Sequence, residues 1–231
     1  MKKSSFCIFI VWLFSFTIYG QNKITISEIL GKQIPLGGNE NPYKLRTEVY
    51  KAFIAMKKAA MKEGIEIKIV SGYRSLNRQR FIWDKKFKKY TAQGFSRVKS
   101  TEKIIEYSTY PGTSRHHWGT DIDIVQKVDF MPKQLLNARN FDTEGAFCVL
   151  HDWMQKYAAD YGFYLAYTND INRKGFSYEP WHYSYKPTAT LFLNTALKQK
   201  VYNNLLKKSN TSLNESYIST HILGVNLILI P

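Results

Sequence analysis

The sequence of 231 residues is long enough for one domain with a substantial core, and 44% hydrophobic with 22% charged residues is the composition of an ordinary globular protein. The formal charge of +15 favours polyanionic partners such as nucleic acid, an anionic membrane surface or an acidic wall polymer. With two cysteines in the whole chain, a disulfide framework and a cysteine-rich zinc site are both excluded.

The first twenty residues have the pattern of a secretory signal peptide. Two lysines near the start precede an apolar run over residues 6–18, and a small residue, Gly20, follows it. A retained membrane anchor is the alternative, but the run is short for a membrane-spanning helix. We therefore expect cleavage near Gly20, an exported protein of the periplasm or cell envelope, and no stable membrane insertion afterwards. Export argues against nucleic acid as a partner and leaves Cys148 as a single cysteine, which we expect to be buried.

Residues 21–44 are rich in turn signals, and we interpret them as a lead-in that wraps the domain. Apolar residues at three- and four-residue steps then predict a helix over 45–62, which Gly64 ends. Residues 65–70 alternate between apolar and polar side chains and predict a strand. The strand leads into a turn at 71–75, which opens a second helix.

A strongly basic stretch follows that turn, from Lys85 to Lys103. Lysines and arginines on a helix and a loop usually form a solvated surface. The alternative is a docking surface for anionic wall material. The sequence is compatible with both interpretations.

The second half of the chain is predicted to alternate between strands and helices. Strands are expected over 120–125 and 163–167 and as a pair over 176–185, helices over 143–161 and 188–207, and an irregular segment over 131–142. The tail over 208–231 is polar and then apolar, and its apolar part is too short to cross a bilayer as a helix. We expect this tail to be an appended strand or a loose end.

The stretch that offers most chemistry is PGTSRHHWGTDID at residues 111–123, together with the later EPWH. His116, Asp123 and His182 supply two imidazoles and one carboxylate, a set that suits a zinc ion with an open position for water. Glu179, three residues before the last of these histidines, is then the candidate base for that water.

Other interpretations stand beside this one. Side chains two apart on a strand share a face, so Asp121 and Asp123 point to the same side, where Asp121 either competes for the metal or orients a histidine. Lone histidines are usually structural, and we expect His117 to point away from the metal. On a regular strand Glu179 would face away from the last histidine, so we expect a bend at Pro180.

Three blocks of the sequence resemble the VanY-type D-alanyl-D-alanine carboxypeptidases, which belong to the LAS group of zinc peptidases with the D-Ala-D-Ala dipeptidases and several phage endolysins. The family pattern S-x-H-x-x-G-x-A-x-D matches at Ser114, His116, Gly119 and Asp123, its E-x-W-H at Glu179, Trp181 and His182, and its Y-R-S with a following Gln at Tyr73, Arg74, Ser75 and Gln79. The blocks occur in the family's order, and the resemblance covers about residues 45–206. One position departs, because Asp121 stands where the family usually has Ala; this alters the surroundings of the metal or the fit of the substrate.

The resemblance implies an α+β fold of the Hedgehog/DD-peptidase kind over residues 45–207. In this fold a small antiparallel sheet has helices packed on one side and a zinc site at its edge. The implied roles are zinc binding by His116, Asp123 and His182, catalysis by Glu179, stabilisation of the oxyanion or of a substrate carboxylate by Arg74, and substrate contacts by Ser114, Gln79 and Tyr73.

The predicted activity is zinc-dependent removal of the terminal D-Ala from peptidoglycan stem peptides, by a monomeric enzyme. An endopeptidase of the same group is one alternative, and a non-catalytic zinc-containing wall-binding domain is another. Glu179 argues against the second, because a structural metal site has no use for a free base beside the ion. A nucleic-acid-binding protein is disfavoured, since no motif of that kind is present.

Overall fold

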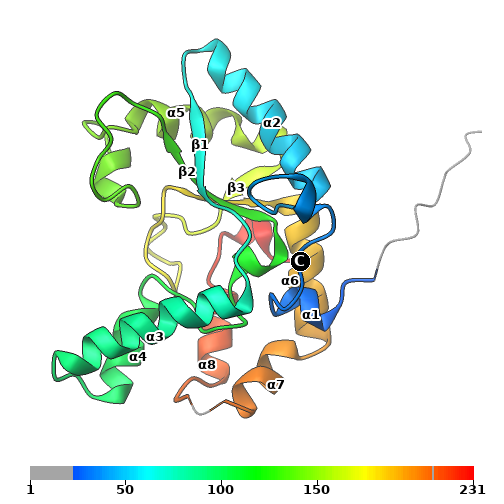
Figure 1. The fold of residues 1–231 in the computed structure, drawn as a ribbon, viewed down its shortest axis with the longest axis vertical. Coiled ribbons are helices and arrows are strands. Elements are labelled where there is room, and N and C mark those ends of the chain that lie inside the picture. The colour runs from blue at the N-terminus through cyan, green and yellow to red at the C-terminus, as the bar shows by residue number, and fades with distance from the viewer. Residues whose placement is uncertain (1–22, 210) are drawn as a thin grey trace, which may run out of the picture.

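The structure is a computed structural model, and it describes residues 23–209 and 211–231. The predicted signal peptide over residues 1–20 lies outside the described residues. Across the described ranges, no helix combines the length and apolar character needed to span a membrane. The predicted α+β class is confirmed, because helices surround a single four-stranded antiparallel sheet (Figure 1).

The sheet has the strand order β1-β2-β4-β3. Its strands are β1 (Ile67–Ser71), β2 (Asp121–Gln126), β3 (Phe163–Leu165) and β4 (His182–Tyr185). The predicted strand pair over 176–185 is therefore wrong in its first half, since residues 176–181 form no strand. Pro180 lacks the N–H that a strand would donate, and the chain turns there, with the His182 N–H donating to the carbonyl of Glu179 at 3.1 Å.

Helices cover the apolar face of this sheet, as the resemblance implied. Ile122 and Ile124 of β2 are fully buried on that face, against α2 (Thr47–Lys62) and α5 (Cys148–Tyr157). α2 contributes a stripe at helical spacing, formed by Val49, Phe53, Met56 and Ala60. This cluster is the main core of the protein.

Two predicted helices differ in extent. α5 begins later than residue 143, because Gly145 N–H donates to the Asp142 carbonyl in a preceding turn, and it continues as the 3-10 helix η4 (Ala158–Tyr161). Cys148 is consequently half-buried at the start of α5, not buried as predicted. The helix predicted over 188–207 is divided into α6 (Lys186–Lys198) and α7 (Val201–Lys207), because Lys200 adopts a left-handed conformation with φ 50°.

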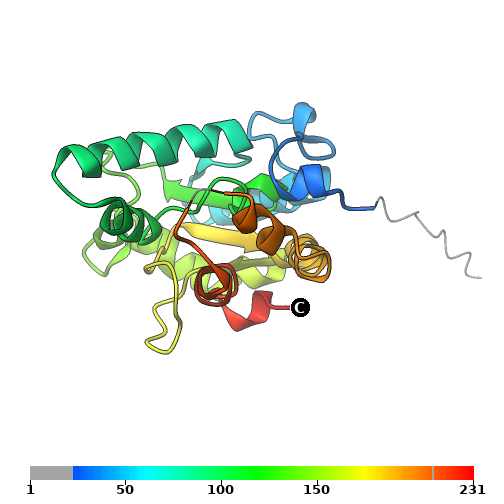
Figure 2. The same cartoon turned by 90° about the horizontal axis from the view of Figure 1, so that it is seen from below.

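Helices α3 (Leu76–Ala92) and α4 (Arg97–Ile105) pack against each other and extend away from the sheet as an arm (Figures 1 and 2). Ser75 caps the start of α3 by accepting a hydrogen bond from the Arg78 N–H at 3.2 Å. α3 buries only Gln79 and Trp83 along its seventeen residues. The arm therefore adds little to the main core.

A second core lies between the C-terminal helices and the short 3-10 helix η2 (Arg115–Trp118). Trp118 packs on Phe192 of α6 at a ring separation of 5.8 Å. The lead-in joins this core through α1 (Ile26–Ile29). Two further 3-10 helices are η1 (Gly38–Glu40) and η3 (Ala138–Phe141).

The C-terminal tail is neither a strand nor a loose end. It forms α8 (Glu215–Tyr217), the π-helix η5 (Ile218–Ile222) and the 3-10 helix η6 (Leu227–Leu229). Leu229 is fully buried against the segment that follows β3. Asn226 fixes this packing, because its backbone N–H donates to the Ala166 carbonyl at 2.8 Å. The apolar residues of the tail thus fill a small core instead of extending the sheet.

Candidate active site

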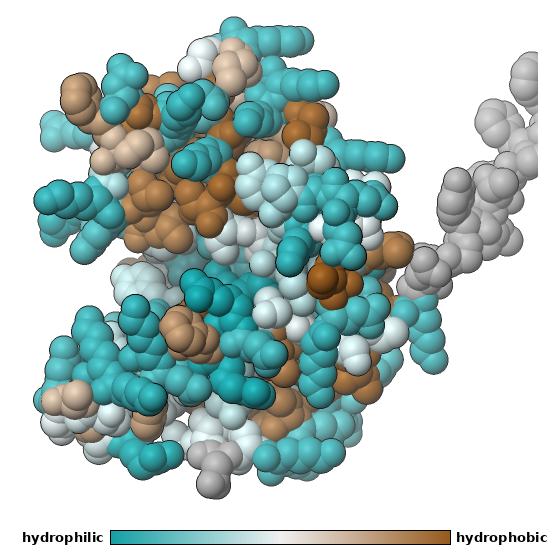
Figure 3. Space-filling model, in the orientation of Figure 1, coloured by the Kyte–Doolittle hydropathy of each residue, from teal (hydrophilic) through white to brown (hydrophobic). Residues whose placement is uncertain are grey.

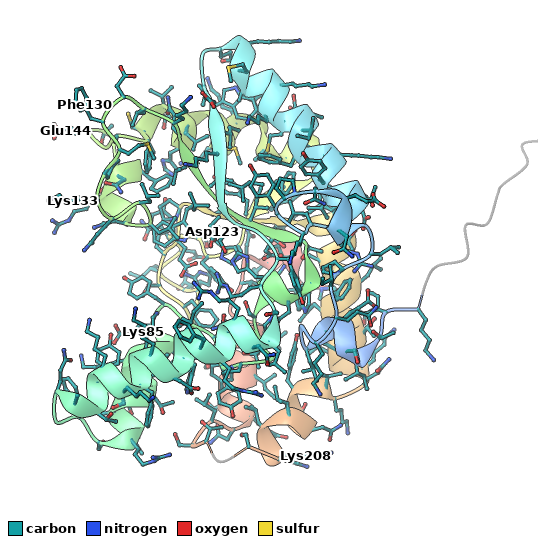
Figure 4. All side chains as sticks on the ribbon, in the orientation of Figure 1. Lys85, Asp123, Phe130, Lys133, Glu144 and Lys208 are labelled. Carbon is teal, nitrogen blue, oxygen red and sulfur yellow. The ribbon has the colours of Figure 1, made fainter. Side chains whose placement is uncertain are left out.

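The candidate site lies on the polar face of the two inner strands, at the end of the sheet where β1 stops and β4 begins. The register places Asp123 beside Ser71 on one side and beside His182 on the other. Asp123 lies at the base of a hollow between the α3–α4 arm and the segment after β2 (Figures 3 and 4). Segments far apart in the sequence therefore meet at this end of the sheet.

Three of the predicted residues come together as a group that could hold a metal ion. Donor atoms of His116, Asp123 and His182 all lie within 4.8 Å of one another, and the three side chains are buried. The glycine after η2 has φ 70°, a left-handed conformation, and this turn carries the chain from His116 into β2.

The hydrogen bonds of the two histidines turn one ring nitrogen of each towards Asp123. His116 Nδ1 lies 2.8 Å from the Gly72 carbonyl, which can only accept, so Nδ1 carries the proton and Nε2 faces Asp123 at 3.3 Å. His182 Nε2 lies 2.9 Å from the Asp121 carboxylate, which leaves Nδ1 facing Asp123 at 3.4 Å. Both rings are thus oriented from behind, as in metal sites where a second partner fixes the tautomer.

The polar groups of the site fit a cation. Asp123 Oδ1 is buried with no hydrogen-bond partner, as expected for an oxygen that binds a metal ion. Burial lowers the pKa of His182, but hydrogen bonds to Asp121 and Glu179 outweigh that effect and raise it to about 10, so the surroundings favour positive charge at this point. Two imidazoles and a carboxylate are also the donor types that zinc prefers in sites with an open position.

Asp121 stands behind His182 and is not part of the metal group. Its Oδ2 accepts from Arg115 Nε at 2.8 Å and from His182 Nε2, while Oδ1 accepts from Ser184 Oγ at 2.8 Å and Thr120 Oγ1 at 2.7 Å. Burial raises the pKa of the Asp121 carboxyl, yet Arg115 and His182 together hold it below its ordinary value. Of the two interpretations of Asp121, the geometry favours the one in which it orients a histidine.

Glu179 reaches the metal group through the turn at Pro180. Its Oε2 lies 3.2 Å from His182 Nδ1, and the side chain is largely buried. The backbone is held from the other side, because the Glu179 N–H donates to the Tyr167 carbonyl at 3.1 Å. The expected bend at Pro180 therefore brings Glu179 and His182 to the same side of the chain.

Arg74 lies beside the metal group, and a buried glutamine holds it there. Arg74 Nη1 donates to Gln79 Oε1 at 3.0 Å, and Nη2 lies 3.8 Å from Asp123 Oδ2. Burial lowers the pKa of Arg74, and Asp123 and Glu179 oppose that shift. Gln79 is fully buried and donates to the Thr109 carbonyl at 2.8 Å, so it lies behind Arg74 instead of on an open surface.

A cavity of about 230 Å³ opens at the metal group. Its lining includes Ser114 and Arg74 among the predicted substrate-contacting and catalytic residues, but neither Gln79 nor Tyr73. Tyr73 points the other way, and its hydroxyl lies 3.2 Å from the Gly31 carbonyl and 3.1 Å from the Gln33 carbonyl of the lead-in. Trp181 packs on Phe141 in the main core and also borders the cavity.

Sequence reasoning missed several groups around the site. Tyr167 lines the cavity and packs edge-on against the His182 ring at 4.8 Å, and burial raises its pKa well above the ordinary value. Arg115 pairs with the charge of Asp121, and its position inside the motif, directly before His116, was the signal that could have found it. Tyr167 ends a predicted strand, and that position was its one available signal.

His117 is buried away from the metal group, as expected. Its Nε2 accepts from the Gly112 N–H at 3.2 Å, so its Nδ1 carries the proton and donates to the Arg74 carbonyl. Both ring nitrogens are satisfied only in this neutral form. Burial accordingly lowers the pKa of His117 to about 4.

Comparisons with known proteins bear on the family of this chain. The sequence profile of the family described as "VanY: D-alanyl-D-alanine carboxypeptidase" matches residues 42–188. The protein YodJ of Bacillus subtilis (strain 168) is 31% identical over 213 residues, which cover 81% of this chain and 70% of YodJ. A D-alanyl-D-alanine carboxypeptidase of Enterococcus faecalis (strain ATCC 700802 / V583) is 30% identical over 128 residues, which cover 55% of this chain and 42% of that protein.

One solved structure supports the fold. The VanY D,D-pentapeptidase from a VanB-type vancomycin resistance cassette, in complex with Zn(II), superposes with a TM-score of 0.50 at 22% identity. The match covers 70% of this chain and 83% of that chain.

Proposed function

The chain belongs to the VanY family of D-alanyl-D-alanine carboxypeptidases, and from that premise we propose that it is a zinc-dependent enzyme that removes the terminal D-Ala of peptidoglycan stem peptides. The observation that carries the proposal is the group of His116, Asp123 and His182 with Glu179 beside it, in a cavity that Arg74 borders. The E. faecalis relative is named for the same activity, and the VanY structure at TM-score 0.50 contains zinc.

His116, Asp123 and His182 would hold the metal through the two ring nitrogens that face Asp123 and through the aspartate oxygens. A bound zinc ion supplies a water whose pKa falls towards ~7, and it polarises the peptide carbonyl. The protein's own contribution is orientation: the Gly72 carbonyl fixes one ring and Asp121 fixes the other. The donor atoms therefore need little rearrangement when the ion binds.

Glu179 is the proposed general base and acid. Its carboxylate oxygen Oε2 would take the proton of the attacking water and later deliver it to the nitrogen of the departing D-Ala. The turn at Pro180 and the hydrogen bond to the Tyr167 carbonyl hold this side chain in place. Because Glu179 is largely buried, its proton transfers would occur away from bulk water.

Arg74 favours a carboxypeptidase over an endopeptidase. Its guanidinium borders a cavity of about 230 Å³, which is smaller than the ~300–1,000 Å³ of sites for drug-sized ligands. Such a space suits the short C-terminal end of a peptide, whose carboxylate would pair with Arg74 while Ser114 contacts the backbone. Gln79 would act through Arg74, by holding the guanidinium towards the cavity.

Peptidoglycan as a substrate requires that the enzyme reach the cell envelope. The predicted signal peptide over residues 1–20 would provide export, with the mature enzyme acting as a monomer. We propose this location together with the activity.

The test is mass spectrometry of a synthetic stem pentapeptide ending in D-Ala-D-Ala, incubated with the purified protein. We expect release of a single D-Ala, loss of that release with a chelator, and recovery when zinc is added back. Release of a dipeptide or an internal cut would favour the endopeptidase alternative. Zinc binding without any cleavage would favour the wall-binding alternative and overturn the proposed enzyme.

A further inference from the structure

The positive charge of the protein is concentrated on the α3–α4 arm. Residues 76–105 contain nine Lys and Arg against two Asp and Glu, a net charge of +7. Residues 21–231 contain 31 Lys and Arg against 18 Asp and Glu, a net charge of +13. About half of the excess charge therefore lies on thirty residues, and the single ion pair within that fully described segment joins Lys99 to Glu102 at 2.9 Å.

Part of this charge forms a stripe along one side of α3. Arg78 and Ile82 border a hollow that they share with Arg74 and the end of β1, and Arg74 also lines the cavity at the metal group. Lys85 and Lys89 follow Arg78 by seven and eleven residues, which places them on the same side of an α-helix. Figure 4 shows Lys85 on the edge of α3 that borders the hollow.

The stripe has a defined length and begins at the site. Arg74 lies four residues before Arg78, just ahead of α3, and eleven residues at 1.5 Å per residue separate Arg78 from Lys89 by about 16 Å. That distance equals about five residues of an extended peptide at ~3.3 Å each. Figure 3 shows the hollow with hydrophobic side chains gathered above it and hydrophilic ones below it, on the arm.

The arm keeps this charge in place without serving the main core. Its outer part is held by cations that pack on its own aromatic rings, with Arg97 5.2 Å from the Phe87 ring centroid and Lys103 4.8 Å from that of Phe95. Two members of the stripe make similar contacts, with Arg78 5.3 Å from the Phe81 ring centroid and Lys89 5.9 Å from that of Tyr90. A projecting helix that buries two residues and presents a cationic edge to the cleft is suited to binding a polyanion.

We propose that Arg78, Lys85 and Lys89, called here the α3 stripe, form a docking surface for polymeric peptidoglycan through the carboxylates of its stem peptides. This inference rests on the proposed function, because the docked polymer would be the one whose peptide end enters the cavity. Carboxylates recur on neighbouring stem peptides, so a cationic stripe that starts beside the cavity meets several of them at once. The stripe would raise activity on the polymer more than activity on a free peptide.

The test compares a stripe variant with a control of equal charge and spacing. The stripe variant is R78Q/K85Q/K89Q, and the control is K51Q/K58Q/K62Q on α2, whose three lysines have the same seven- and four-residue spacing on the far side of the sheet. We measure kcat/KM for D-Ala release from insoluble sacculi and from a soluble pentapeptide. The stripe variant should lower the sacculus-to-peptide ratio about tenfold at low salt, because three exposed charges are removed together, and the effect should shrink at high salt, which screens such charges.

Several outcomes would overturn the proposal. An unchanged ratio, an equal fall in the control variant, or a fall that persists at high salt would each do so. Sacculi stripped of phosphate polymers with hydrofluoric acid test the other source of anions, since an effect lost on stripped sacculi would assign the stripe to phosphate. Failure of the proposed function would look different, because the wild-type protein would then release D-Ala from neither substrate. In that case, co-sedimentation of both variants with stripped sacculi would test the stripe directly.

Discussion

The two faces of β2 are both buried but differ in role, because one stabilises the fold and the other forms the candidate site. Ile122 and Ile124 are fully buried among the side chains of α2 and α5, whereas Asp121 and Asp123 are 0% and 3% exposed on the other side of the strand. The apolar face gains stability from burial itself. Burying the charges of the polar face costs free energy, which is offset because each charge has a partner of opposite sign. The result is a set of oriented atoms that could bind a metal ion. Burial alone therefore does not say which residues hold the fold.

The largest effect expected on the polar face is loss of turnover in Glu179→Gln. The amide cannot accept the proton of water, and general-base catalysis contributes ~100- to 10,000-fold, so we expect kcat to fall about 1,000-fold. His116, Asp123 and His182 are untouched, so zinc content should stay at one equivalent. The measurement is D-Ala release from the pentapeptide together with metal analysis of the same preparation. Near-normal turnover would remove Glu179 from the mechanism.

The apolar face should respond in the opposite way. Ile122→Ala removes buried methyl groups and leaves a cavity, which we expect to lower the free energy of unfolding by about 3–4 kcal/mol. Turnover per folded molecule should stay close to that of the wild type, because Ile122 does not reach the site. Denaturant unfolding measures the first quantity and kcat at low temperature the second.

The control for this prediction is Ile171→Ala. Ile171 is 96% exposed, so its truncation should change the free energy of unfolding by less than ~0.5 kcal/mol. If both variants unfold alike, the main core is not where the structure places it.

These two faces also show how far the sequence carries a prediction. The alternation of IEIKIV and of DIDIV predicted two strands of the sheet, and the resemblance of three motifs to the VanY-type enzymes pointed to the residues of the metal group and to Glu179. Local pattern could not reveal that Ser184 and Arg115 meet at Asp121, because that contact depends on the pairing of β2 with β4. The prediction of a strand or loose end for the tail was wrong for a similar reason. The apolar residues of the tail pack in a small core that forms only when the loop after β3 has folded.

His117 lies on the polar side of the sheet, yet we expect its replacement to change stability. This result would show that the polar side contributes to stability as well as to activity. Its folded pKa of about 4 is below the ordinary 6.5 because of burial. A histidine with a lowered folded pKa contributes its full stability above pH 6.5. As the pH falls from 6.5 towards 4 this contribution is lost, and the loss in the free energy of unfolding reaches about 3 kcal/mol at pH 4. The measurement is the free energy of unfolding at several pH values in that window.

His117→Gln supplies the comparison for the pH series. The glutamine cannot titrate, so the difference between wild type and variant should shrink steadily from pH 7 to pH 4. Parallel curves for the two proteins would show that His117 is not the group responsible.

The smallest effect concerns the orientation of His182. Replacing Asp121 alone would leave the buried Arg115 charge unpaired, so the informative variant is R115Q/D121N, which removes both charges. Loss of the carboxylate behind a metal-binding histidine typically weakens metal affinity ~10- to 100-fold, and we expect a rise of that size in the zinc Kd by competition with a chelator. Thr120→Val removes only the hydrogen bond to Asp121 Oδ1 and should leave the zinc Kd near wild type. Equal Kd values for all three proteins would mean that His182 is oriented by the packing of Tyr167 and not by Asp121, and the buried ion pair would then be part of the fold alone.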